Sequence, residues 1–191
     1  GSFLCVKGIQ RRFASQAKAS KVEKEDGAGD PTGTKTMIVL GSGGHTSEMF
    51  RVVRHLDATR YRPRVYVVSA TDKMGERKVR MHEDADEASP VVQVVRIPRS
   101  REVGQSYLTS IFTTLTAMLA TTRVVLAERP KLVLCNGPGT CLPVCVMCRL
   151  LLPLTCRVVF IESICRTESL SLTGALVYRL GIAHPCFVPW E

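Results

Sequence analysis

The sequence predicts one α/β domain of the Rossmann-like type, a mostly parallel sheet with helices on both faces, and three observations lead to this expectation. The chain has 191 residues, of which 45% are hydrophobic and 23% charged, which is the size and composition of a single globular domain. Short apolar runs alternate with longer segments of helical spacing. The runs are continuously apolar, as expected of strands that are covered on both faces.

The composition divides the chain into three parts. Residues 1–34 are polar and rich in Lys, Ala, Ser and Gly, which predicts a flexible arm. Residues 35–180 hold the alternating apolar runs and form the predicted domain. Residues 181–191 contain Pro185 and Pro189 and predict an irregular tail.

The predicted elements follow from apolar spacing. Strands are expected at the short runs 36–40, 64–70, 91–97, 131–135 and 157–161. Helices are expected where apolar residues recur every three or four positions, at 46–56, 73–86, 105–128, 142–152 and 170–180. The uncharged stretch 104–122 contains eight Ser or Thr residues. We therefore expect the long helix to pack its apolar face on the sheet, in preference to lying in a membrane interface or crossing a membrane.

Charge and cysteine content narrow the class of partner. The net charge of +9 suits a polyanion, but aromatic residues are only 6% and do not alternate with the basic ones, which disfavours nucleic acid. Most of the eight cysteines lie in apolar runs, which predicts buried thiols in a reducing compartment. Cys145 and Cys148 form a C-x-x-C inside a predicted helix with no nearby His, which favours buried structural thiols over a redox or zinc pair. No cofactor is expected.

A glycine-rich turn joins the first predicted strand to a helix. Its residues Ser42, Gly43, Gly44, His45 and Thr46 would lie at the start of that helix, where free backbone N–H groups can face an anion. His45 is a possible general base near neutral pH. The same turn also fits an ordinary strand-to-helix connection closed by a helix cap, so both interpretations remain open. The chain lacks a G-x-x-x-x-G-K-[ST] motif, which disfavours a P-loop ATPase.

Three further segments follow predicted strands, and ligands of open α/β sheets bind beyond the carboxyl ends of the strands. The arginines among these residues can neutralise phosphate, and a carboxylate can accept a sugar hydroxyl. A solvated basic loop and a charge at a helix start are the competing interpretations. The candidate residues are Asn136 and Gly137 in one turn, Arg99 and Arg101 in a second, and Glu162 and Arg166 in a third.

Four blocks occur together and in order: GSGGHTSEM (41–49), IPRSREVGQS (97–106), LCNGPGTCLPVC (134–145) and FIESICRTESLSLTG (160–174). Through these blocks, residues 36–180 resemble the eukaryotic UDP-N-acetylglucosamine transferase subunit of asparagine-linked glycosylation, the fourteenth protein in that pathway's naming. That family in turn resembles the N-terminal, acceptor-binding half of a GT-B glycosyltransferase of the MurG type.

The resemblance implies a subunit that does not bind the sugar donor. A separate soluble subunit, the thirteenth protein of the pathway, would bind UDP-N-acetylglucosamine. Together they would add the second N-acetylglucosamine to N-acetylglucosaminyl-diphosphodolichol. The present chain would recruit its partner to the cytosolic face of the endoplasmic reticulum membrane, supply the acceptor site, and be inactive alone.

The resemblance also implies roles for individual residues. His45 is the first candidate for a catalytic base and Glu162 the second. The remaining candidates would bind the acceptor diphosphate: Ser42, Gly43, Gly44, Thr46, Arg99, Arg101, Asn136, Gly137 and Arg166. No metal is expected.

Two alternatives and two departures accompany this interpretation. The chain could instead be a bacterial-type polysaccharide glycosyltransferase subunit, or a membrane scaffold with no catalytic group. The family begins with a hydrophobic anchor helix, where this chain has a polar arm. It also continues past residue 180 with further strand and helix, so the predicted tail suggests a shortened carboxyl end.

Overall fold

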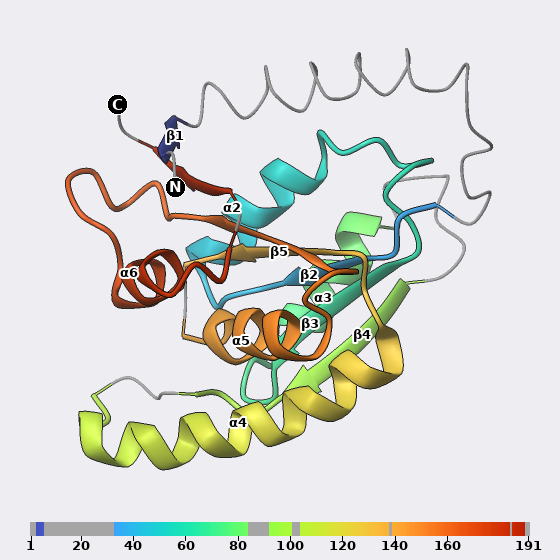
Figure 1. Ribbon diagram of the computed structural model, residues 1–191. Helices are drawn as coiled ribbons and strands as arrows, with labels where there is room; N and C mark the ends of the chain where they lie inside the picture. Colours follow the sequence, from blue (N-terminus) through green and yellow to red (C-terminus); the bar gives the residue numbers. More distant parts are fainter. Residues whose placement is uncertain are drawn as a thin grey trace.

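The computed structural model describes residues 3–5, 33–83, 92–100, 104–137, 139–183 and 185–189. Within these residues, one sheet of seven parallel strands has the order β1-β7-β6-β5-β2-β3-β4 (Figure 1). Most of the arm expected over 1–34 lies outside the described residues, as does Arg101. The strands are β1 (Phe3–Cys5), β2 (Thr36–Val39), β3 (Arg64–Ser69), β4 (Val92–Ile97), β5 (Leu132–Asn136), β6 (Arg157–Ile161) and β7 (Cys186–Val188).

Helices cover both faces of the sheet, which confirms the predicted fold class. The helices are α2 (Gly44–Val53), α3 (Gly75–Glu83), α4 (Tyr107–Glu128), α5 (Cys141–Leu151) and α6 (Leu172–Arg179). Helices α2 and α3 lie on one face of the sheet, and α4, α5 and α6 lie on the other (Figure 1). Neighbouring strand residues point to opposite faces, so Ile38 belongs to the core on the side of α2 and α3, while Met37 belongs to the core on the side of α4, α5 and α6. The continuous apolar runs are therefore explained by burial on both sides.

The chain reverses its direction across the sheet between β2 and β5. From β2 it proceeds outward through β3 to β4, then returns to the other side of β2 and continues through β5, β6 and β7. β2 and β5 are direct neighbours, with Val39 opposite Cys135. Such a switch point opens a crevice at the carboxyl ends of the two strands, where ligands of this fold class bind. The turns after β2 and β5 meet at this position.

The prediction of an irregular tail over 181–191 is wrong at its centre. Cys186–Val188 form β7, which pairs in parallel with β6 on one side and with β1 on the other. All three side chains are buried. Pro185 and Pro189 lie just outside the strand, where their missing N–H groups interrupt no ladder bond. β1 itself lies inside the expected arm, so Phe3–Cys5 depart from that expectation as well.

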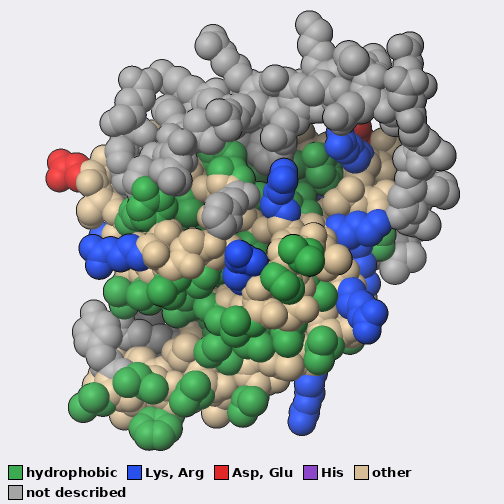
Figure 2. Space-filling view, in the orientation of Figure 1, with side chains coloured by type: hydrophobic (Ala, Val, Ile, Leu, Met, Phe, Trp, Pro, Cys, Tyr) green, Lys and Arg blue, Asp and Glu red, His purple; other side chains and the backbone are tan. Residues whose placement is uncertain are grey.

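The expectation that α4 packs its large apolar residues on the sheet is also wrong. Those residues form an exposed row along the helix, which we call the α4 apolar stripe: Leu108, Ile111, Phe112, Leu115 and Leu119 (Figure 2). Smaller side chains face the protein instead, including buried Ala117 and Thr121. The Thr121 hydroxyl donates to the carbonyl of Ala117 at 2.7 Å, so a polar residue can be buried there with its hydrogen bond made.

The cysteine prediction is confirmed for the central thiols. Cys135, Cys141, Cys145 and Cys148 are buried and unpaired by disulfide. Burial raises the pKa of the Cys135 thiol well above its ordinary value. These thiols act as small apolar core residues between β5 and α5.

Candidate functional site

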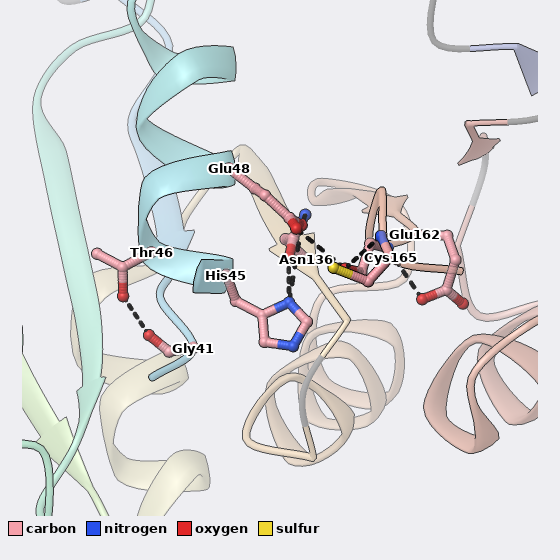
Figure 3. A network of polar contacts seen from close by, with 8 residues as sticks. Gly41, His45, Thr46, Glu48, Asn136, Glu162 and Cys165 are labelled. Carbon is pink, nitrogen blue, oxygen red and sulfur yellow. Dashed lines mark hydrogen bonds and ion pairs between the residues drawn. The ribbon is translucent and has the colours of Figure 1, made fainter. Parts of the chain in front are cut away.

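The glycine turn after β2 places the first turn of α2 at the switch point. Gly43 precedes the helix with φ 67°, a left-handed conformation that a glycine adopts without steric cost. The buried Thr46 hydroxyl donates to the carbonyl of Gly41 and closes the turn (Figure 3). Thr46 therefore has a structural partner, while Ser42, Gly43 and Gly44 are exposed. No side chain caps the start of α2.

Four side chains from three of the motif blocks form one hydrogen-bonded cluster, which we call the Glu48 network (Figure 3). The Nδ1 atom of His45 lies 2.9 Å from Oδ1 of Asn136. The Nδ2 atom of Asn136 donates to Oε2 of Glu48 at 3.0 Å. The Ser163 hydroxyl donates to Oε1 of Glu48, also at 3.0 Å. His45 and Glu48 come from α2, Asn136 ends β5, and Ser163 follows β6.

The Glu48 network reaches solvent mainly through the imidazole. Asn136 and Ser163 are 2% and 3% exposed, and the Glu48 side chain is 11% exposed. The His45 side chain is 34% exposed. Both carboxylate oxygens of Glu48 accept a hydrogen bond, which is what a nearly buried charge requires. The accessible chemistry of the cluster is therefore that of the His45 ring.

Gly137 leaves the space that the imidazole occupies. A Cβ atom at this position would lie 3.0 Å from Cε1 and 3.2 Å from Nδ1 of His45. Gly137 also has φ 66°, so a side chain there would strain the backbone as well. The glycine is thus required by two independent features of the turn after β5.

Glu162, the second candidate base, lies outside the Glu48 network. It is 1% exposed, and its Oε2 accepts the backbone N–H of Ser171 at 2.8 Å. Its Oε1 accepts the N–H of Ser163 at 3.0 Å. Ser171, which the Glu162 carboxylate contacts, is the N-cap of α6. The carboxylate points away from His45 (Figure 3). The geometry fits a structural role, holding the connection between β6 and α6.

The loop after β4 crosses the carboxyl edge toward the network. The hydroxyl of Ser100 donates to the carbonyl of Gly139 at 2.5 Å, in the turn after β5. β4 lies three strand positions from β5, or about 14 Å, so this loop folds back over the sheet. Arg99 is half-buried in this loop, and Arg166 is exposed in the loop after β6. The basic loops and the glycine turns therefore share one edge.

Two members of the network were not among the sequence candidates. Glu48 follows His45 by three residues, a spacing that puts both side chains on one face of a helix. That spacing is the signal that could have identified Glu48. Ser163 had no comparable signal, because its role depends on a contact with a residue 115 positions earlier.

A separate hollow of about 410 Å³ lies at the opposite edge of the sheet. Its lining includes Lys131, Arg149 and Arg157, near the amino ends of β5 and β6. It is not part of the Glu48 network, which lies at the carboxyl ends. In the described part of the chain, no group of three or more His, Cys, Asp or Glu side chains is arranged to hold a metal ion.

Solved structures with a similar fold include MurG of Acinetobacter baumannii, with a TM-score of 0.58 and 19% sequence identity. The match covers 81% of this chain and 41% of MurG. A UDP-N-acetylglucosamine 2-epimerase matches with a TM-score of 0.55 and 19% identity, over 82% of this chain and 42% of the epimerase. This chain therefore has the fold of about two-fifths of those enzymes.

Sequence comparison identifies much closer relatives. The mouse protein named UDP-N-acetylglucosamine transferase subunit ALG14 is 45% identical over 157 residues, covering 77% of this chain and 72% of the mouse protein. The human protein of that name is 42% identical and covers 76% and 71% of the two chains. The family model described as "Oligosaccharide biosynthesis protein Alg14 like" matches residues 36–191. These matches agree with the four motif blocks, and the chain therefore belongs to the Alg14-like family of oligosaccharide biosynthesis proteins.

Proposed function

We propose that this chain is the acceptor-side subunit of a heteromeric N-acetylglucosaminyltransferase. The reaction is the addition of the second N-acetylglucosamine to N-acetylglucosaminyl-diphosphodolichol, at the cytosolic face of the endoplasmic reticulum membrane. The observation that carries the proposal is the meeting of the β2, β5 and β6 turns in the Glu48 network at the switch point. The names of the relatives support the class of reaction.

His45 is the base in this proposal. The acceptor hydroxyl attacks the anomeric carbon of the donor sugar, the bond from that carbon to UDP breaks, and the hydroxyl proton must be removed. Because Nδ1 of His45 is engaged by Asn136, the other ring nitrogen, Nε2, receives the proton. The 34% exposure of the side chain leaves the ring accessible to a bound acceptor.

The acceptor diphosphate would bind beside the imidazole. The exposed residues Gly43 and Gly44 lie at the uncapped start of α2, where free backbone N–H groups attract anions. Arg99 and Arg166 lie on loops at the same edge and would neutralise the phosphate charge. The Asn136 amide is already used within the Glu48 network, so we assign it to positioning His45. Arg101 follows in the same loop sequence as Arg99, outside the described residues.

The donor site would come from a partner chain. A MurG-like enzyme joins two halves, and this fold matches 41% of MurG. A soluble subunit that binds UDP-N-acetylglucosamine would supply the other half, and recruitment of that subunit to the membrane is part of the proposed role. On this basis the isolated chain has no transferase activity.

The α4 apolar stripe would bring the domain to the bilayer. The 22 residues of α4 extend about 33 Å. Within Leu108–Glu128, an 18-residue window has a mean hydropathy of 1.4, and 22% of the residues in that window are buried. The length and composition of the segment would therefore allow it to cross a membrane. We place it flat in the interface, because Ala117 and Thr121 are buried against the protein. The Thr113 hydroxyl of α4 donates to the carbonyl of Ser100 at 2.6 Å, in the loop after β4. The stripe therefore begins near the carboxyl edge of the sheet, where the acceptor would bind.

The test uses the complex with the soluble partner subunit. The complex is purified, and transfer of N-acetylglucosamine from its UDP donor to a synthetic N-acetylglucosaminyl-diphosphate lipid is measured. We expect transfer by the wild-type complex and a fall of about 100-fold or more for His45→Ala, with co-purification unchanged. Arg51→Ala, an exposed change on the same helix, serves as the control. A wild-type rate for His45→Ala would remove the base role, and no transfer by the wild-type complex would contradict the function.

One observation favours a second candidate, a membrane scaffold that recruits the partner without a catalytic group. The α4 apolar stripe is exposed and shares no residue with the Glu48 network. A membrane contact through the stripe therefore does not require a catalytic role for the network. The scaffold predicts that replacing both His45 and Arg166 preserves transfer, while polar substitutions in the stripe abolish it. Dolichyl and polyprenyl acceptors, compared in the same assay, distinguish the eukaryotic reaction from a bacterial-type polysaccharide transferase.

A further inference from the structure

We propose that Glu48 determines which ring nitrogen of His45 carries the hydrogen, acting through the Asn136 amide. Glu48 is thus a positioning residue: it does not contact the substrate, but it holds the base in the tautomer that leaves Nε2 free to accept a proton. The inference rests on the proposed function, because it assigns a task to the same imidazole.

The first step of the argument fixes the orientation of the amide. An ionised carboxylate can only accept hydrogen bonds. Oε2 of Glu48 lies 3.0 Å from the side-chain amide of Asn136, so the amide must present its NH₂ group to Glu48. In the reverse orientation the amide oxygen would face the carboxylate, so two acceptors would oppose each other, and at 2% exposure Asn136 has little access to water to compensate.

The second step fixes the imidazole. With its NH₂ group facing Glu48, Asn136 presents Oδ1 to His45, and an amide oxygen can only accept. The 2.9 Å contact is therefore a hydrogen bond donated by Nδ1–H of His45. In the neutral ring the lone pair is then on Nε2. A histidine oriented in this way accepts a proton at Nε2 without releasing the bond at Nδ1.

The third step concerns the charge that develops during transfer. When the acceptor hydroxyl gives its proton to Nε2, the new C–O bond forms, the electron pair of the broken bond leaves with UDP, and the ring becomes an imidazolium. Oε2 of Glu48 lies 3.7 Å from Nδ1, so a negative charge is already in place beside the new positive one. The proton then leaves Nε2 to solvent, and the neutral ring is restored.

Ser163 holds the Glu48 carboxylate in the orientation that its hydrogen bond from Asn136 requires. Its hydroxyl donates to Oε1 at 3.0 Å, which leaves Oε2 for Asn136. The Ser163 hydroxyl also accepts the backbone N–H of Cys165 at 3.3 Å, so its hydrogen is directed to Glu48. Each carboxylate oxygen thus has a separate donor, from β5 or from the loop after β6.

Glu48→Gln is the informative substitution, because it keeps the shape of the side chain but replaces a carboxylate, which can only accept hydrogen bonds, by an amide, which can also donate them. A glutamine can present either its oxygen or its NH₂ group to Asn136, so both orientations of the Asn136 amide become satisfied. We therefore expect a mixture of the two His45 tautomers. Glu128→Gln is the matched control: the Glu128 side chain is also 11% exposed, but it pairs with Lys35 at the opposite edge of the sheet.

The primary readout is the ¹⁵N NMR spectrum of the full chain labelled at histidine, recorded between about pH 5 and 9, where imidazole titrates. His45→Gln identifies the His45 signals among those of the four histidines. The proposal expects hydrogen on Nδ1 in the wild type and in Glu128→Gln, and mixed tautomers in Glu48→Gln. Hydrogen on Nε2 in the wild type, or an unchanged tautomer in Glu48→Gln, would overturn it.

The second readout is transfer by the complex with the partner subunit. We expect kcat to fall about 10- to 100-fold in Glu48→Gln with KM unchanged, because part of the His45 population can no longer accept the proton and the carboxylate charge beside Nδ1 is lost. Unchanged kcat despite mixed tautomers would overturn the catalytic part. The NMR experiment needs no substrate, so failure of the wild-type complex to transfer sugar contradicts the proposed function separately.

Discussion

Replacement of Gly137 by alanine tests whether the turn after β5 maintains the position of the imidazole. The added Cβ would lie 3.0 Å from Cε1 and 3.2 Å from Nδ1 of His45, where ordinary contacts begin at about 3.4 Å. The ring would have to move away by a few tenths of an ångström. That movement acts directly on the 2.9 Å hydrogen bond between His45 and Asn136.

The substitution should have two measurable costs. The left-handed backbone at φ 66° costs an alanine about 1–2 kcal/mol, which lowers the free energy of unfolding by that amount. With the proposed role of His45 as base, its displacement adds a loss of transfer activity of about tenfold or more, since an error of 1 Å in the position of a reacting group can cost about 100-fold. The first cost is backbone strain, and the second is specific to the site.

Gly181→Ala separates the two costs. Gly181 has φ 60°, and an added Cβ there meets no atom within 4 Å. Urea unfolding should show a similar loss of stability in both variants, while transfer by the complex should fall only in Gly137→Ala. Equal transfer by the two variants at matched folded concentration would refute the reasoning, because the contact with His45 would then have no functional effect.

Three further predictions concern other parts of the molecule. Phe112→Gln should weaken binding of the chain to phospholipid vesicles about 10- to 100-fold, because burial of a Phe side chain contributes about 1.5–3 kcal/mol; unchanged sedimentation with vesicles would exclude the α4 apolar stripe as a membrane contact. A maleimide at pH 7.5 should modify exposed Cys165 well before Cys186, because burial raises the pKa of Cys186 to about 11; mass spectrometry showing the reverse order would contradict the described burial. The side-chain hydrogen bond from Thr59 holds the pKa of Asp57 below its ordinary value, so this carboxylate stabilises the fold above about pH 4, and the contribution is lost as the pH falls through the folded pKa. Asp57→Asn should therefore be less stable than the wild type in urea at pH 7 and equal to it near pH 2, and a constant difference would contradict the shift.

The sheet was predictable because its central strands are buried on both faces. β6 coincides with the apolar run 157–161, β2 ends one residue before its predicted run does, and β5 is shifted by one residue from the run 131–135. β7 was not predicted, because a three-residue strand between two prolines has no periodicity to detect. Its formation depends on pairing with β6 and β1, which is tertiary information.

The candidate site was predictable in its location and less so in its connections. Parallel strands bring their carboxyl ends to one edge, so the turns holding His45 and Asn136 were expected to meet. The hydrogen bonds that give Glu48 and Ser163 their roles join residues 88 and 115 positions apart. The sequence could not predict where the Glu162 side chain points. A carboxylate that follows a strand can face either a ligand or the start of the next helix.

The same separation along the chain sets the order in which the site is completed during synthesis. Asn136 leaves the ribosome 91 residues after His45, which is roughly 5–18 s at usual elongation rates. Until then, the α2 helix can form, but the Glu48 carboxylate lacks its two hydrogen-bond donors, Asn136 and Ser163, and stays hydrated. A nascent chain that stops before β5 would therefore expose a histidine with no fixed proton, and the Glu48 network would form only when the second half of the sheet has joined the first.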